Sequence, residues 1–331
     1  MSTIPLTSDE KLSCYTVIGG KERLNSTGLS AILLNRGGRY ARRNLFYDLE
    51  KAGFDTVVSV EPKPFHYDIE ELSNRFPFVR FMLLHQSYNM GEQINMAVYE
   101  IDTPLFFVIW NDMKFITGGN AEKLAKRLTY APGNAQTIKR LCTVPAIQNA
   151  RFETLPTIQA PALQRKKIIT RLLSHKGEGL PSIYPFDGVG IYDREKFRKI
   201  EFDGSYNNRY WQLMDFGFRS YLWGEKIAGT QVLKLLYEDK VPSEDSTIDT
   251  DYSRFYLRNI APLYRQNNAC LPMRRFPGYY FKTKSKIAAA WNDFKISRDW
   301  VNENSSRWKS APQTIIGLWK PSAIEELPLE L

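Results

Sequence analysis

Leu105-Phe106-Phe107-Val108-Ile109-Trp110-Asn111-Asp112-Met113 is the stretch of sequence that decides the fold. Its first six residues are apolar and contain no Gly or Pro, which predicts a parallel strand buried on both faces. Asp112 then lies two positions past the end of that strand, at the edge where open α/β sheets bind ligands. A carboxylate does not continue the burial of the strand, so it faces solvent or a group that needs a negative charge. The alternative is an aspartate that only caps the following turn.

The residues before this stretch alternate between strand and helix patterns. Strands are expected at 29–34, 56–60 and 79–84, and helices at 40–52, 69–75 and 92–101. This alternation predicts an α/β fold with a mostly parallel central sheet and helices on both faces. The loops that follow the strands then meet at one edge of the sheet. Residues 1–27 carry few periodic signals.

The second half of the chain is less regular. Residues 145–165 contain Pro and Gln and are expected to form an extended or loop segment. Beyond them, a strand is expected at 187–192, a helical turn at 193–199, an aromatic-rich helix at 207–223 and a strand at 230–236. The C-terminal residues, 250–331, mix helical patterns with aromatic and basic side chains, which predicts a helical or irregular extension.

Composition favours a soluble, cytoplasmic protein with a substantial core. The chain has 331 residues, of which 43% are hydrophobic, and a net charge of +9. No apolar run is long enough to span a membrane, and the start lacks the pattern of a signal peptide. Eleven basic and two acidic residues lie between Glu122 and Lys176. Such a patch suits phosphates, an anionic membrane surface or nucleic acid, although no nucleic-acid-binding motif accompanies it; the alternative is a solvated basic face.

Several catalytic motifs are absent from the sequence. It contains no Walker or dinucleotide-type Gly-rich loop, no Gly-x-Ser-x-Gly elbow and no zinc-type cluster of Cys and His. What remains is a sheet edge with polar groups and the single carboxylate of Asp112. Mg²⁺ commonly uses one or two protein carboxylates together with substrate phosphates, so Asp112 alone could hold a metal-bound diphosphate.

The order of these pieces resembles the GT-A fold glycosyltransferases, in particular family 2-like enzymes that use nucleotide sugars. The resemblance covers residues 28–237. It rests on Leu34-Asn35-Arg36, on Tyr88-Asn89-Met90-Gly91 with Asn95, on Trp110-Asn111-Asp112-Met113, on Asp187-Gly188-Val189-Gly190 and on the helix from Tyr210 to Arg219. The third of these stands where the family has its metal-binding Asp-x-Asp motif, here with one carboxylate instead of two.

The resemblance implies a donor site, a metal and a division of the chain. The implied donor-binding residues are Asn35, Arg36, Glu61, Asn89, Gly91, Asn95, Trp110, Asn111 and Asp112. Asp112 is also the implied ligand of Mg²⁺ or Mn²⁺. Residues 1–240 would form the nucleotide-sugar-binding and acceptor domain. Residues 241–331 would form an extension that packs on it and contacts the acceptor or an anionic membrane surface.

The resemblance leaves two candidates for the general base, because the family's acidic pair falls near Gln212-Leu213, which carries no carboxylate. Asp215 is the first candidate and Asp203 the second. A base must lie within hydrogen-bond reach of the acceptor hydroxyl. The alternative for Asp215 is an ion pair with Arg219, four residues later on the same helix.

The expected function is transfer of a sugar from a nucleotide donor to a saccharide, lipid-linked or protein acceptor, with the stereochemistry left open. A nucleotidyltransferase is one alternative, weakly favoured by the basic loop at 35–39. A non-catalytic basic binding protein on the same fold is the other, favoured by the aromatic and basic residues near 274–284.

Overall fold

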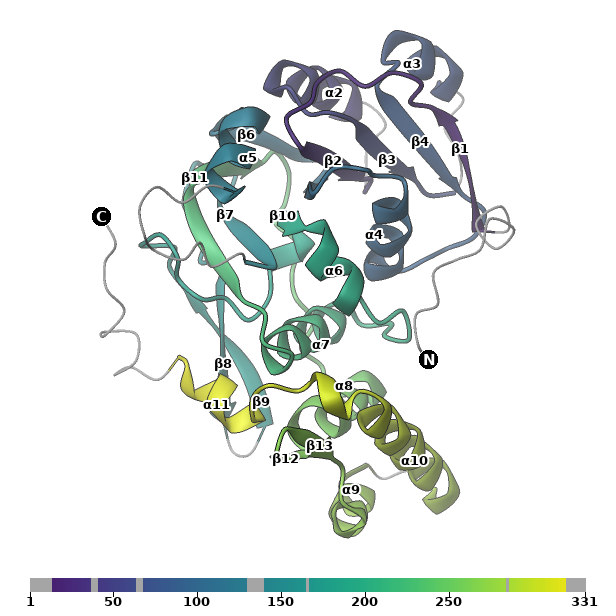
Figure 1. Cartoon of the computed structure of the whole chain (residues 1–331), viewed down its shortest axis with the longest axis vertical. Coiled ribbons are helices and arrows are strands. Elements are labelled where there is room, and N and C mark those ends of the chain that lie inside the picture. The colour runs from purple at the N-terminus through teal and green to yellow at the C-terminus, as the bar shows by residue number, and fades with distance from the viewer. Residues whose placement is uncertain are drawn as a thin grey trace.

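A computed structural model describes residues 14–36, 41–63, 68–129, 140–164, 167–283 and 286–319. Its central sheet is built from β1 (Tyr15–Gly19), β2 (Leu29–Leu34), β3 (Val57–Glu61), β4 (Val79–Leu84), β5 (Leu105–Trp110), β6 (Met113–Thr117), β7 (Cys142–Gln148), β10 (Gly190–Asp193) and β11 (Ile227–Tyr237). Within the described residues these nine strands lie in the order β1-β4-β3-β2-β5-β10-β7-β11-β6 (Figure 1). The expected α/β fold class is confirmed.

The four predicted strands of the first half of the chain, β2 to β5, are parallel to one another and largely buried. β2 pairs with β3 and with β5, and β3 pairs with β4, all in parallel. Every residue of β2 and of β5 is buried. The connecting helices are α2 (Ala41–Ala52), α3 (Ile69–Arg75) and α4 (Met90–Tyr99), close to the expected ranges.

The strand order reverses between β2 and β5. The chain leaves β2 toward β3 and β4, then returns to place β5 on the other side of β2. Such a switch point opens a crevice at the carboxyl ends of the two strands. Leu34 pairs with Trp110 in the ladder, so the residues that follow each strand emerge at the same level.

Antiparallel strands extend the sheet on both sides. β1 pairs with β4, β10 pairs with β5 and β7, and β6 pairs with β11, all antiparallel. The sequence analysis expected neither β1 nor β6, because each is five residues long and partly exposed. The strand expected at 187–192 begins only at Gly190, since Phe186–Gly188 forms a short 3-10 turn.

The remaining helices and hairpins surround this sheet. The described helices of the second half are α5 (Ala121–Thr129), α6 (Arg194–Ile200), α7 (Arg209–Leu222), α8 (Thr250–Phe255), α9 (Phe276–Thr283), α10 (Ile287–Glu303) and α11 (Pro312–Gly317). Residues 145–165, expected to be extended, supply most of β7 and β8 (Ile158–Gln164). β8 forms a hairpin with β9 (Lys167–Leu173), and β12 (Leu263–Arg265) forms a second one with β13 (Asn268–Cys270).

The C-terminal helices α8, α9 and α10 gather at the end of the molecule opposite α2 and α3 (Figure 1). They are joined to the rest of the chain through α7, where Phe255 stacks on Trp211 with ring centroids 5.5 Å apart. The boundary at residue 240 stays a prediction. None of the helices in the described ranges combines the length and hydropathy needed to cross a membrane.

Candidate functional site

Arg36 and Asp112 meet at the switch point, directly after β2 and β5. Arg36 Nε lies 2.9 Å from Asp112 Oδ2, and its Nη2 lies 3.3 Å from Asp112 Oδ1. The same Nη2 lies 2.6 Å from Asp187 Oδ2. One guanidinium therefore bridges two carboxylates that are 75 residues apart in the sequence.

Asp187 is held by three elements besides its own turn. Arg209 Nη1, from the first turn of α7, lies 2.9 Å from Asp187 Oδ1. The hydroxyl of Tyr237, at the end of β11, donates to Asp187 Oδ2 at 2.8 Å. Trp110 Nε1 donates to the Asp187 carbonyl at 3.0 Å. Asp187 also has φ of 55°, a conformation that non-glycine residues adopt rarely, although aspartate adopts it more readily than most. We call Arg36, Asp112, Asp187, Arg209 and Tyr237 the Arg36 cluster.

The environment of Arg36 keeps it charged. Burial opposes its charge, but the Asp187 and Asp112 carboxylates more than compensate and raise the pKa of Arg36 further above its ordinary value. The guanidinium carbon lies 4.1 Å from the ring centre of Trp110 and 5.5 Å from that of Tyr237, within the range of cation–π attraction. Its Nη1 is buried and has no hydrogen-bond partner among the described residues.

The divalent cation expected at Asp112 finds few ligands in this structure. Both Asp112 oxygens are engaged by Arg36. Asp187 Oδ2 is engaged by Arg36 and Tyr237. Asp187 Oδ1 is ion-paired with Arg209 but has no hydrogen-bond partner among the described residues. In the described part of the chain, no three or more His, Cys, Asp or Glu side chains come together, so a cation here would depend on the two carboxylates that Arg36 and Arg209 already pair with. The residues present therefore do not fit a divalent cation.

Asn35 and Glu61 lie together beside the Arg36 cluster, after β2 and at the end of β3. Asn35 Nδ2 donates to the Val60 carbonyl at 2.7 Å and lies 3.4 Å from Glu61 Oε1. Ser59 Oγ donates to the same Glu61 oxygen at 2.7 Å. Asn35 Oδ1 is buried without a partner among the described residues. Asn111 also lies here, and its Oδ1 accepts from the Arg36 backbone N–H at 3.0 Å.

Asn89, Gly91 and Asn95, also expected at the donor, instead hold the loop that precedes α7. Asn89 caps α4 and donates through Nδ2 to the Gly204 and Tyr206 carbonyls at 3.0 Å each. Asn95 Nδ2 donates to the Phe202 carbonyl at 2.8 Å. A Cβ on Gly91 would come within 2.4 Å of the Phe202 Cβ, so glycine permits this close packing. The structure gives these three residues a structural role at that loop.

Asp215 lies in the interior with both oxygens occupied. Its Oδ2 accepts from Arg219 Nε at 2.6 Å, and its Oδ1 accepts from Tyr206 at 3.1 Å and from Asn259 at 2.7 Å. Its side chain has no solvent exposure. The ion pair with Arg219, which the sequence analysis kept as an alternative, is present. The carboxylate thus offers no oxygen to an acceptor hydroxyl.

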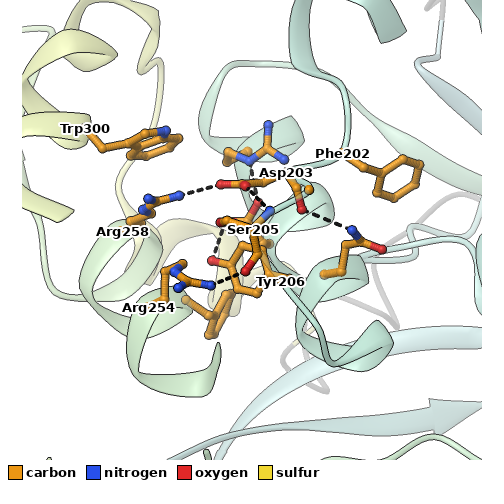
Figure 2. Close-up of polar contacts among 12 residues, drawn as sticks. Phe202, Asp203, Ser205, Tyr206, Arg254, Arg258 and Trp300 are labelled. Atoms are coloured by element: carbon orange, nitrogen blue, oxygen red, sulfur yellow. Dashed lines mark hydrogen bonds and ion pairs between the residues drawn. The ribbon is translucent and has the colours of Figure 1, made fainter. Parts of the chain in front are cut away.

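Asp203, the second candidate base, faces the C-terminal helices. Figure 2 shows Arg258 reaching Asp203 from one side, with Trp300 lying near the guanidinium. Arg258 Nη1 lies 2.5 Å from Asp203 Oδ2, and its guanidinium carbon lies 5.0 Å from the Trp300 ring centre. Burial acts to raise the pKa of Asp203, but Arg258 and the Ser205 hydrogen bonds outweigh it and lower that pKa. A lowered pKa makes Asp203 a weaker base.

A cavity of about 400 Å³ adjoins the Arg36 cluster. Its lining comes from β9 and the segment just before β8, from one neighbour each of Asp187 and Arg209, and from the loop after β11. It includes Thr170, Phe186, Tyr210, Pro242 and Glu244. The two Glu244 oxygens each lie 3.0 Å from the Tyr184 hydroxyl, which donates to them. Burial raises the pKa of Glu244 to about 7, against the opposing effects of Tyr184 and Arg209, and Asp187 adds to the rise.

The sequence analysis did not select Asp187, Arg209, Tyr237 or Glu244 as site residues. Asp187 stood in a stretch that carried the family resemblance, whereas nothing in the local sequence marked the other three. Residues 37–39 of the loop that favoured a nucleotidyltransferase lie outside the described residues. So do residues 130–139 and 165–166 of the basic stretch.

Comparison with known proteins bears on the fold. No protein-family model and no curated protein matches the sequence. A structure of GalNAc-T7 with UDP, GalNAc and Mn²⁺ matches with a TM-score of 0.53 at 10% identity, over 93% of this chain and 59% of that chain. A structure of S. aureus TarS 1-349 in complex with UDP matches with a TM-score of 0.43 at 12% identity, over 83% of this chain and 71% of that chain. The chain has the GT-A glycosyltransferase fold and spans 59% of the length of the GalNAc-T7 chain.

Proposed function

We propose that this protein transfers a sugar from a nucleotide-sugar donor to a hydroxyl of a saccharide, lipid-linked or protein acceptor. The observation that carries the proposal is the Arg36 cluster, which lies at the switch point of a GT-A fold, where such sheets bind ligands. The GalNAc-T7 structure of the same fold contains UDP and GalNAc, which supports a donor of this chemical class.

On the donor side, we place the diphosphate against Arg36 and the nucleoside beside Asn35 and Glu61. Guanidinium groups bind phosphate oxygens with two parallel hydrogen bonds. Asn35 Oδ1 is a buried acceptor without a partner among the described residues, so an N–H group of the base could satisfy it. The Trp110 ring lies against the Arg36 guanidinium, and Asn111 Oδ1 accepts a hydrogen bond from the Arg36 backbone N–H.

On the acceptor side, we place the acceptor in the cavity beside Asp187, with Glu244 as the general base. The acceptor oxygen attacks the anomeric carbon as the bond from that carbon to the phosphate oxygen breaks and the nucleoside diphosphate leaves. The acceptor's proton passes to a Glu244 oxygen. A carboxyl with a pKa of about 7 is well matched to this task near neutral pH. Phe186 and Tyr210 offer aromatic surface to a sugar ring.

A peripheral contact with an anionic membrane surface is the third part of the proposal. Along α9 and α10, large apolar side chains are exposed, among them Phe281 at 81%, Ile287 at 61% and Trp291 at 44%. Arg274 and Arg275, which directly precede α9, are exposed as well. Exposed apolar and basic side chains in neighbouring segments suit the interface of a negatively charged bilayer.

A donor screen tests the proposal. Melting temperatures of the full chain are measured with UDP-, GDP-, CMP- and dTDP-sugars, in EDTA and in Mn²⁺, because a ligand that binds the native state raises them. One donor class is expected to raise the melting temperature and, with an acceptor pool, to release its nucleotide. If no donor class does either, the proposal is wrong.

A further inference from the structure

We infer that this site neutralises the donor's diphosphate with guanidinium groups instead of a divalent cation, with Arg36 as the central positive charge. The inference rests on the proposed function, since it concerns the same donor. It departs from the metal that the resemblance implied, and it is argued from the contacts of the Arg36 cluster.

The first argument is the place of Arg36. Two carboxylates that converge at a sheet edge need a cation between them, and Arg36 lies between Asp112 and Asp187 with contacts of 2.9 and 2.6 Å. A metal that bound these carboxylates would have to displace the guanidinium from both. The displaced Arg36 would lose both ion pairs and would lie close to a divalent cation of the same sign.

The second argument is the charge of the cluster. Arg36 and Arg209 together carry a formal charge of +2, the same as one Mg²⁺ or Mn²⁺ ion. Asp112 and Asp187 carry −2, so the two guanidiniums balance them as a divalent cation would. The net charge of these four side chains is therefore zero, the same as that of two carboxylates with a bound divalent cation.

The third argument is which charges face the solvent. The side chains of Arg36 and Arg209 are 23% and 32% exposed, whereas those of Asp112 and Asp187 are 16% and 1% exposed. Both guanidiniums are therefore partly accessible to a diphosphate, whereas the Asp187 carboxylate is not. The buried Arg36 Nη1 also lacks a partner in the described part of the chain, and such a donor marks a place where a ligand or water completes the hydrogen bonds.

Nucleotide titration of the full chain tests the inference. The probes are UDP, GDP and dTDP, titrated by calorimetry in EDTA and again in Mn²⁺, so that binding is read without any turnover. The variants are Arg36→Met, which removes the charge, and Arg36→Lys, which keeps the charge but loses the planar fork. Arg43→Met is the matched control, because Arg43 also pairs with one carboxylate, Glu71 at 2.8 Å, on the exposed face of α2.

We expect the wild-type chain to bind one nucleotide with the same affinity, within about twofold, in EDTA and in Mn²⁺. Arg36→Met should weaken nucleotide binding at least tenfold in EDTA. The affinity of Arg36→Lys should lie between those of the wild type and Arg36→Met, and the affinity of Arg43→Met should match that of the wild type. Circular dichroism identifies a variant that fails to fold, in which case Arg36→Lys carries the comparison.

Two results would overturn the inference, together with the placement of the diphosphate at Arg36 in the second case, while leaving the proposed sugar transfer intact. The first is wild-type binding that needs Mn²⁺ and disappears in EDTA. The second is an undiminished affinity in both folded Arg36 variants. Absence of binding by every nucleotide under both conditions is a different result, because it contradicts the proposed function itself.

Discussion

At the scale of single residues, the chemistry of the site depends on groups whose charge is set by their neighbours. Arg36 stays charged because two carboxylates surround it, and Asp203 is a weak base because Arg258 lies against it. Glu244 is the opposite case: burial favours its protonated form. These differences assign Arg36 to anion binding and make Glu244 the strongest candidate base among the carboxylates considered. They could not be predicted from the sequence, because every one of these partners is distant along the chain.

The pKa of Glu244 predicts a pH-dependent stability. An unfolded glutamate ionises near pH 4.3, whereas Glu244 in the native state ionises near 7. Between these values the native state binds more protons than the unfolded state, so the free energy of unfolding falls as the pH rises. Glu244→Gln cannot ionise, and should raise the melting temperature by about 2 °C or more at pH 8. At pH 5 the variant and the wild type should melt within about a degree of each other. Equal melting temperatures at pH 8 would contradict the raised pKa.

The same residue predicts a pH-dependent rate. The transfer rate should rise as the pH passes through about 7, because only the ionised Glu244 accepts a proton. Glu244→Gln should lower kcat by about 100-fold or more and remove this rise, with nucleotide affinity retained. Glu225→Gln is the control, since Glu225 is a partly exposed carboxylate paired with Lys196. A Glu244→Gln variant that keeps the wild-type rate profile would exclude Glu244 as the base.

At the scale of elements, the sequence predicted the parallel strands and their helices well, and the contacts between them poorly. β2, β4, β5 and α3 begin and end at the expected residues, because buried apolar runs and helical periodicity are local signals. The short strands β1 and β6 form only because a longer neighbour supplies their hydrogen bonds. The site could not be predicted for the same reason, since Arg36 and Arg209 both reach Asp187 only when the segments next to β2, β10 and α7 come together.

Asp215 on α7 predicts a large loss of stability on substitution. Asp215→Ala removes one partner of a buried pair and leaves Arg219, which is 4% exposed, without its carboxylate. Breaking such a pair costs about 3–5 kcal/mol. Glu195→Ala on α6 is the matched control, because it breaks an i, i+4 pair with Lys199 whose side chains are 82% and 68% exposed. Urea unfolding should show a far larger loss for Asp215→Ala, and equal losses would contradict the structural role of Asp215.

At the scale of the whole molecule, the net charge of +9 and the exposed side chains of α9 and α10 are the features that bear on location. The sequence predicted a basic protein and a C-terminal extension. Which apolar residues of that extension stay uncovered depends on how α9 packs on α10. Phe276, for example, is covered by Trp291, with ring centroids 4.9 Å apart, whereas Phe281 remains exposed.

Vesicle binding follows from this surface. The full chain should sediment with vesicles that contain phosphatidylserine, less so as salt increases, and not with neutral vesicles. Phe281→Ser should weaken binding several-fold. Phe152→Ser is the control, because Phe152 is also exposed, at 66%, but lies on the loop after β7. Equal effects of the two substitutions would contradict a membrane-facing role for α9.

The central claim is that Arg36, at the carboxyl ends of β2 and β5, holds the diphosphate of the nucleotide without a metal ion. A crystal structure of the full chain with the nucleotide identified by the donor screen tests this most directly. The account predicts diphosphate oxygens within hydrogen-bond distance of Arg36, with Arg209 beside them and the base toward Asn35. A nucleotide bound away from this edge, or a metal ion that joins its phosphates to Asp112, would contradict it.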